Sequence, residues 1–196
     1  MTKFTKWLLL GISIFVTSNV SAQWGVSGGC DFSSLSNSES AEMQMGFHLG
    51  TTYDVPLVSN FYFQPGLLFT SNGFNFQPDY FYKKKLVRMY ALEVPLNLSL
   101  RPKLKKNLRL ITDFGLYMRY GLFGNKEYKS SNDTETIKES SFVVYNRPDF
   151  GLNCGLGLAY ERIALIGAYQ MGLTNAEKNI SGIRHKKIRI TFRYLF

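Results

Sequence analysis

The chain has 196 residues, of which 23 are basic and 14 acidic, and its formal net charge is +9. This length allows one domain with a sizeable core or one small barrel. Beyond the N-terminal segment, no apolar run approaches the roughly 20 residues that a membrane-spanning helix needs, which excludes a helical membrane protein.

The N-terminal segment has the three parts of a secretory signal peptide. Lys3 and Lys6 make its start basic, residues 7–16 form an apolar run, and Val20-Ser21-Ala22 is a small-residue cleavage site. We therefore expect residues 1–22 to be a signal peptide and residues 23–196 to form the exported domain. Its removal leaves 21 basic and 14 acidic residues, a net charge of +7. Export argues against nucleic acid as a partner and favours an anionic surface.

The rest of the chain alternates apolar and polar residues with the two-residue period of β-strands. In chain order this period predicts eight strands, over residues 24–33, 43–55, 61–70, 88–98, 108–122, 149–160, 163–174 and 187–196. The connections alternate between long and short, and the short ones are residues 56–60, 101–107 and 161–162. This order predicts an all-β fold, an eight-stranded antiparallel up-and-down transmembrane β-barrel. A soluble eight-stranded barrel has no reason to segregate its loops in this way.

The two faces of the predicted strands differ in size and charge, which indicates which face points outward. The closing strand places Ile188, Ile190 and Phe192 on one face and Arg189 and Arg193 on the other. Most strand glycines fall on the charged face, where a narrow barrel needs small residues. We therefore expect the apolar faces to contact lipid and the charged faces to fill the lumen.

The charges on the inward faces are the best candidates for a functional site. The predicted lumen charge network consists of Asp31, Glu93, Arg109, Asp113, Arg119, Asp149, Arg189 and Arg193. Asp54, Glu161, Arg88 and Lys187 are expected on the same faces, which gives six acids and six bases. Unpaired charges in a narrow interior are unfavourable, so we expect mutual pairing and a closed lumen. A selective pore should show one dominant sign of charge.

The sequence offers little for catalysis. No G-x-S-x-G element is present, and no serine is placed by sequence to act with His48 or His185 as a nucleophile. We therefore expect no enzyme activity, no cofactor and no metal site. Cys30 and Cys154 fall on strands that are not neighbours, so we expect two free, lipid-facing thiols rather than a disulfide.

One connection stands out as a possible contact surface outside the barrel. It is aromatic and then basic, and its candidate contact residues are Phe76, Tyr80, Phe81, Tyr82, Lys83, Lys84 and Lys85. Such a loop could dock a partner protein, a glycan or lipopolysaccharide. It could equally fold over the mouth of the barrel.

Four stretches of the sequence resemble the small outer-membrane β-barrel family that is often described as porin-like or PorT-related. They are residues 63–69, residues 92–96, residues 149–157 and residues 169–175. The resemblance implies a location in the outer membrane, with lipid and lipopolysaccharide as neighbours. Terminal Phe196 resembles the carboxy-terminal signal read by the barrel-assembly machinery. The family as a group implies no shared chemistry.

These observations together predict a monomeric outer-membrane barrel with a packed lumen and a structural, adhesive or accessory role. Two alternatives remain at this point. The PorT-related resemblance implies an accessory component of an envelope secretion or motility apparatus, with an envelope protein as its partner. An outer-membrane lipid-modifying enzyme is the third and least favoured hypothesis, because the catalytic motif is missing.

Overall fold

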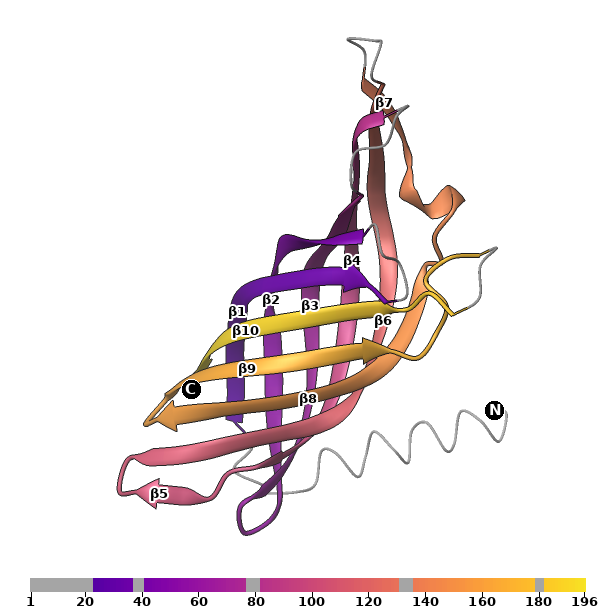
Figure 1. Cartoon of the computed structure of the whole chain (residues 1–196). Helices are drawn as coiled ribbons and strands as arrows, with labels where there is room; N and C mark the ends of the chain where they lie inside the picture. Colours follow the sequence, from indigo (N-terminus) through magenta and orange to yellow (C-terminus); the bar gives the residue numbers. More distant parts are fainter. Residues whose placement is uncertain (1–22, 37–40, 77–81, 131–135, 179–181) are drawn as a thin grey trace, which may run out of the picture.

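The computed structural model describes residues 23–36, 41–76, 82–130, 136–178 and 182–196 (Figure 1). The expected signal peptide, residues 1–22, lies outside the described residues. The described strands are β1 (Gln23–Leu35), β2 (Ala41–Val58), β3 (Phe61–Phe76), β4 (Tyr82–Leu100), β5 (Lys103–Lys105), β6 (Leu108–Ser130), β7 (Thr136–Ser140), β8 (Pro148–Tyr160), β9 (Ile163–Gly172) and β10 (His185–Leu195). A short 3-10 turn, η1 (Ser141–Val143), follows β7.

Eight long strands close into an antiparallel barrel, as the sequence predicts. Their order around the sheet is β4-β3-β2-β1-β10-β9-β8-β6, and β4 pairs with β6 to complete the circle. The short strands β5 and β7 pair with β6 and do not belong to the barrel wall. Within the described residues, no helix is long and apolar enough to cross a membrane.

Strands β1 and β10 form the seam that joins the two ends of the chain. The register places Asp31 opposite Arg189 and Ser27 opposite Arg193. This register is set by the two-residue period, since a one-residue slip would move Lys187, Arg189 and Arg193 to the lipid face.

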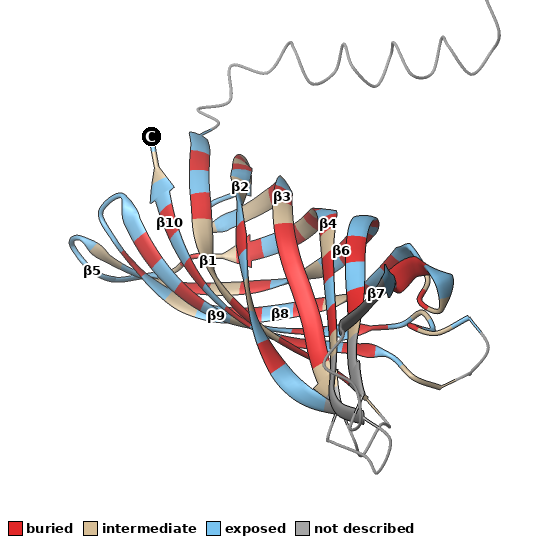
Figure 2. Ribbon diagram, turned by 90° about the horizontal axis from the view of Figure 1, so that it is seen from above, coloured by how far each residue is buried: buried red, intermediate tan, exposed pale blue. Residues whose placement is uncertain are grey.

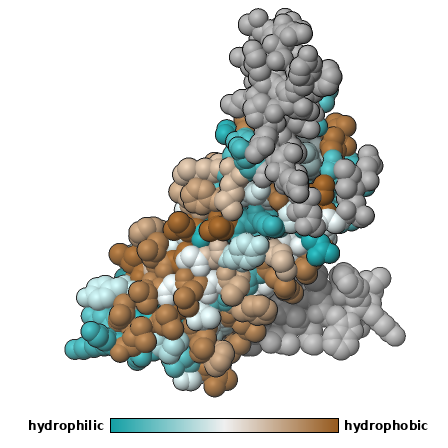
Figure 3. Space-filling view, viewed as in Figure 1, coloured by the Kyte–Doolittle hydropathy of each residue, from teal (hydrophilic) through white to brown (hydrophobic). Residues whose placement is uncertain are grey.

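The two faces of the wall are as predicted, and burial alternates along each strand (Figure 2). On β10, Lys187, Arg189 and Arg193 are buried, whereas Ile190 and Phe192 are exposed. The outer surface of the barrel is a broad apolar area (Figure 3). Inward glycines leave space for large side chains. A Cβ atom on Gly151 would lie 2.5 Å from the ring of Tyr117, so a larger residue does not fit there without movement.

The two ends of the barrel differ. Both described chain ends, Gln23 and Phe196, lie at one end, which we call the terminal end, together with the three short connections that the sequence predicts. The opposite end, which we call the loop end, carries the long connections. There β4 and β6 continue beyond the other strands and pair with each other up to Tyr82 and Ser130.

Several strands are longer than the sequence predicts, which corrects the expected loops. Residues 71–76 belong to β3 and residues 82–85 to β4, so the connection expected between residues 71 and 85 is mostly strand. The polar connection expected after residue 123 is likewise strand up to Ser130, followed by β7 after a gap in the described residues. The apolar-polar alternation weakens beyond the membrane, because the outer face of these strands contacts water rather than lipid there.

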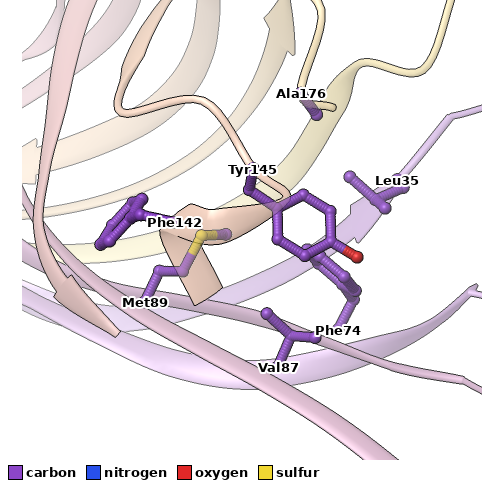
Figure 4. Packing of buried hydrophobic residues seen from close by; sticks show 7 residues of the cluster. All are labelled: Leu35, Phe74, Val87, Met89, Phe142, Tyr145 and Ala176. Carbon is purple, nitrogen blue, oxygen red and sulfur yellow. The ribbon is translucent and has the colours of Figure 1, made fainter. Parts of the chain in front are cut away.

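Apolar residues at the loop end form a cluster that closes the barrel, and we call it the loop-end cap. It consists of Leu35, Phe74, Val87, Met89, Phe142, Tyr145 and Ala176 (Figure 4). The ring of Phe74 meets that of Tyr145 at a centroid distance of 5.1 Å. Lys178 stabilises the cap, because its Nζ donates to the carbonyl oxygen of Phe142 at 2.7 Å. The loop end of the lumen is therefore covered by packed side chains.

Candidate functional site

The centre of the lumen is a network of buried ion pairs built from cross-strand neighbours. Glu93 lies opposite Arg119 on the β4–β6 pair, and Asp31 lies opposite Arg189 on the seam. Arg189 joins the two halves: its Nε donates to Asp31 Oδ1 at 2.8 Å and its Nη1 donates to Glu93 Oε1 at 2.7 Å. Lys187 Nζ donates to Asp31 Oδ2 at 3.1 Å. Glu93 and Asp31 are fully buried, so each carboxylate depends on these cations for compensation.

A second branch of the network runs from Arg119 toward the loop end. Arg119 Nη1 donates to Asp149 Oδ2 at 3.0 Å, and Tyr117 donates its hydroxyl proton to the same oxygen at 3.1 Å. Gln170 connects the branches, since its Oε1 accepts from Arg119 Nη2 and its Nε2 donates to Glu93 Oε1, both at 2.9 Å. Because these contacts come from β4, β6, β8 and β9, the network ties strands from half of the barrel together.

The terminal-end half of the lumen holds separate and looser pairs. Arg101 binds Asp54 with two guanidinium nitrogens. Ser99 donates to Asp113 at 2.5 Å, while Arg193 Nη2 lies 3.7 Å from Asp113 Oδ2, beyond hydrogen-bond distance. Both Arg101 and Arg193 are buried.

Seven of the eight predicted network residues lie buried in the lumen: Asp31, Glu93, Asp113, Arg119, Asp149, Arg189 and Arg193. Arg109 does not. It is exposed at the terminal end, where β6 begins and pairs with the short strand β5. The prediction for Arg109 was wrong because the alternation of β6 was extended past the point where the barrel interior ends.

Two further expectations for lumen charges were also wrong. Arg88 is exposed because it lies two residues before Tyr90 and four before Leu92 on β4, and all three point to the outward side. Glu161 is exposed in the β8–β9 turn, where it accepts from Asn107 Nδ2 at 2.9 Å. The sequence interpretation missed Arg101, which was assigned to a turn. Arg101 lies two residues after Ser99 of β4, so the two-residue period places both on the inward face. This signal could have identified it.

His48 has neighbours that sequence reasoning did not identify. Its Nδ1 lies 2.9 Å from Asp31 Oδ1, and its Nε2 lies 3.1 Å from the hydroxyl of Thr191. An acid, a histidine and a hydroxyl in a row are the groups of a nucleophilic triad. However, all three are buried, and Asp31 is already bound by Lys187 and Arg189. This arrangement is consistent with a packed lumen histidine.

Little space remains in the lumen beside Asp31, His48 and Thr191. A cavity of about 30 Å³ lies between the network and the terminal-end pairs. One water needs about 10–15 Å³, so this space suits roughly two waters. Ser27, Thr52, Asn153 and Arg193 line the cavity, and each has a polar side-chain atom without a hydrogen-bond partner among the described residues. Water would satisfy these atoms.

The predicted contact residues are only partly placed. Phe76 ends β3, and Tyr82, Lys83, Lys84 and Lys85 begin β4 at the loop end. Tyr80 and Phe81 lie outside the described residues. Terminal Phe196 is exposed at the terminal end, where its amide donates to the carbonyl of Trp24 at 3.0 Å.

The described residues contain no group of three or more His, Cys, Asp or Glu side chains that could hold a metal ion. The two cysteines are free, as predicted: Cys154 is exposed on the outer surface and Cys30 is half-buried.

Several solved structures are similar to this chain, and the first of those that follow, with a TM-score above 0.5, supports the fold assignment. Neisserial surface protein A matches with a TM-score of 0.51 and 10% identity, covering 90% of this chain and 99% of that one. Ail, the attachment invasion locus protein of Yersinia pestis, matches with a TM-score of 0.47 and 14% identity over 89% of this chain and 99% of its own. OprG from Pseudomonas aeruginosa gives a TM-score of 0.46 and 12% identity, over 90% and 97% of the two chains. At these identities the likeness concerns the fold alone.

No curated protein matches this sequence. The protein family described as outer membrane protein beta-barrel domain matches residues 17–177. This match does not confirm the narrower PorT-related resemblance. It agrees with the closed eight-stranded barrel and its apolar outer face, and together they place the protein in the outer membrane. The chain therefore belongs to the family of outer membrane proteins with a β-barrel domain.

Proposed function

We propose that this protein is a closed outer-membrane barrel with a structural or adhesive role, which presents its loop end to the cell exterior and carries out no catalysis. The observation that carries this proposal is the packed lumen. Ion pairs among Asp31, Glu93, Arg119 and Arg189 cross its centre, and the loop-end cap covers it on one side.

The closed lumen argues against both a pore and an enzyme. An eight-stranded barrel has an interior just wide enough for side chains, and the buried side chains of Tyr117, Arg119 and Arg189 occupy it here. A substrate would have to displace the cap and the network to reach Thr191 or His48. The proposal therefore assigns the buried charges to stability rather than to transport or chemistry.

The loop end supplies the surface that this function needs. Strands β4 and β6 have 19 and 23 residues, whereas a tilted membrane-crossing strand needs about 9–11. The excess length carries this pair of strands beyond the membrane. Tyr82 and the three lysines that follow it lie on this extension, so the proposed contact surface is strand rather than loop.

Two measurements test the proposal. The purified protein in planar lipid bilayers should give no stable conductance steps, and regular openings would contradict the closed lumen. For the contact role, intact cells that display the wild-type protein should bind a host or envelope partner better than cells displaying the K83Q/K84Q/K85Q variant. Arg88 lies outward on the same strand, and R88Q serves as the matched control for a general loss of charge. Equal binding by both variants and the wild type would refute the contact role.

The targeting proposals are tested separately. We infer that residues 1–22 direct export, and mass spectrometry of the mature protein should then find Gln23 at its N-terminus. We also infer that Phe196 assists insertion by the barrel-assembly machinery, so deletion of this residue should lower the amount of folded protein in the outer membrane. Co-purification of secretion or motility components with the membrane-extracted protein would instead favour the accessory role.

A further inference from the structure

The terminal end carries a concentration of basic side chains that the closed barrel does not use. We call it the terminal-end basic rim, and it consists of Lys103, Lys105, Lys106, Arg109 and Arg162. All five are exposed, and none forms an ion pair with any other residue in the part of the chain that the structure describes. Glu161 is the exposed acid beside them, and it is hydrogen-bonded to Asn107. Such a collection of like charges is unfavourable without an anionic counterpart.

The rim comes from two connections that the fold brings to the same end. Lys103 and Lys105 lie on β5, which pairs with Arg109 and Leu108 at the start of β6. Arg162 lies in the β8–β9 turn, and the register of β6 with β8 brings Leu108 opposite Tyr160, two residues before it. Figure 3 shows a hydrophilic area at the lower left, where Figure 1 places β5.

A hollow of about 360 Å³ opens between these connections, which is large enough for a small polar group. Arg109 and Arg162 line it together with Arg101, Leu195 and Phe196. Arg101 is neutralised by Asp54 and lies over the ring of Tyr62 at 4.7 Å, so it is fixed in place. Glu161 lines the hollow as well, so its unpaired charged side chains are Arg109, Arg162 and one carboxylate, and the three lysines of the rim add the excess of positive charge. Guanidinium groups bind phosphate through paired hydrogen bonds.

The rim also lies close to the lipid-facing surface. Arg162 is flanked within two residues by Tyr160 and Ile163, which are 60% and 53% exposed on the outer wall. Leu104, between the lysines of β5, is 54% exposed and offers an apolar side chain at the same level. Lysines and arginines at a membrane surface are attracted to anionic headgroups, while an apolar neighbour can enter the acyl region.

We propose that the terminal-end basic rim is a binding site for anionic phospholipid, in which Arg109 and Arg162 hold the headgroup phosphate and the lysines of β5 contact neighbouring headgroups. The partner is a phosphodiester lipid with a net negative charge, in the leaflet that surrounds the terminal end. The lipid would supply the anionic counterpart that Glu161 alone does not provide for five cations. It is independent of any contact made at the loop end.

The test measures lipid binding to the full barrel in a neutral detergent by native mass spectrometry. Phosphatidylglycerol and phosphatidylcholine with the same acyl chains are the two probes, since they differ in net charge. The wild type should bind phosphatidylglycerol at least tenfold more tightly, and added salt should weaken this preference. R109Q/R162Q should lose most of the preference, and K103Q/K105Q/K106Q should lose part of it.

The matched control is R184Q/K186Q, which removes two exposed cations at the loop end and should keep the preference. Because all substituted side chains are exposed, each variant should still show the heat-dependent gel shift of a folded barrel. Equal affinities for the two lipids would overturn the proposal. So would an unchanged preference in R109Q/R162Q, or the same loss in R184Q/K186Q. Capture of an acidic periplasmic protein by the rim, with no lipid preference, would also overturn it and identify a different partner.

Discussion

Glu93 has three cationic partners in the lumen, Arg119, Lys187 and Arg189, and its replacement by glutamine gives the sharpest test of the network. Arg119 and Arg189 each bind it through two guanidinium nitrogens, at 2.7 to 3.3 Å, and Gln170 donates to it as well. The substitution keeps the size of the side chain but removes its charge. Arg119, Lys187 and Arg189 would then face only Asp31 and Asp149. Removal of one partner from a buried pair is destabilising by about 3–5 kcal/mol, and we expect E93Q to lower the free energy of unfolding by that amount.

The assay is urea unfolding of the mature barrel in lipid vesicles of fixed composition. The chain has two tryptophans, and if residues 1–22 are removed, Trp24 is the one that remains. Trp24 is 59% exposed on the outer wall, so its fluorescence reports the loss of lipid contact. The transition midpoint and slope then give the free energy of unfolding.

Two further variants decide whether the effect comes from unpaired charge. E161Q neutralises an exposed acid and should change stability by less than about 0.5 kcal/mol. K187Q removes a cation 3.6 Å from Glu93, so E93Q/K187Q should be more stable than the sum of the single effects, by at least about 1 kcal/mol. A loss below about 1 kcal/mol for E93Q, or strict additivity in the double variant, would refute the argument that buried charges in this lumen depend on mutual pairing.

Three more outcomes test the wall of the barrel. L156R, on the outer face near the middle of β8, should lower stability by roughly 2–4 kcal/mol in vesicles, and a negligible loss would reverse the assignment of inside and outside. G151V should lower the unfolding midpoint by an amount equivalent to about 1–3 kcal/mol, because its side chain meets the ring of Tyr117; an unchanged midpoint would contradict the close packing. Cys30 and Cys154 should give identical gel mobility with and without reductant, and a shift that needs both cysteines would demonstrate a disulfide.

Much of the wall could be predicted from sequence because lipid and lumen impose opposite demands on alternate residues. Asp31, Arg189 and Arg193 were assigned correctly since a strand that faces lipid cannot turn a charge outward without a large penalty. The same rule does not operate beyond the membrane. Arg109 was misassigned there, because water solvates a charge on either face and the alternation no longer determines burial. Arg88 was misassigned for another reason, because it was placed on the wrong face of its strand.

It was harder to predict which charges pair with one another in the lumen than which charges lie inside it. The pattern places Glu93, Arg119 and Asp149 inside, but it gives no register between strands, and the register decides which charges meet. The loop-end cap was missed for a related reason. Phe74 lies on the part of β3 that was expected to be a connection, Phe142 and Tyr145 lie between β7 and β8, and only the closed barrel brings them together.

The seam between β1 and β10 has a consequence for how the protein is assembled. Asp31 lies on β1, and its two cations, Lys187 and Arg189, are 156 and 158 residues away. Contacts of such sequence separation form late in folding. An unfinished or truncated chain therefore holds an uncompensated carboxylate until its last strand arrives. We expect this late pairing to act as a checkpoint: chains that lack β10 remain open, and the cell's quality-control proteases can remove them.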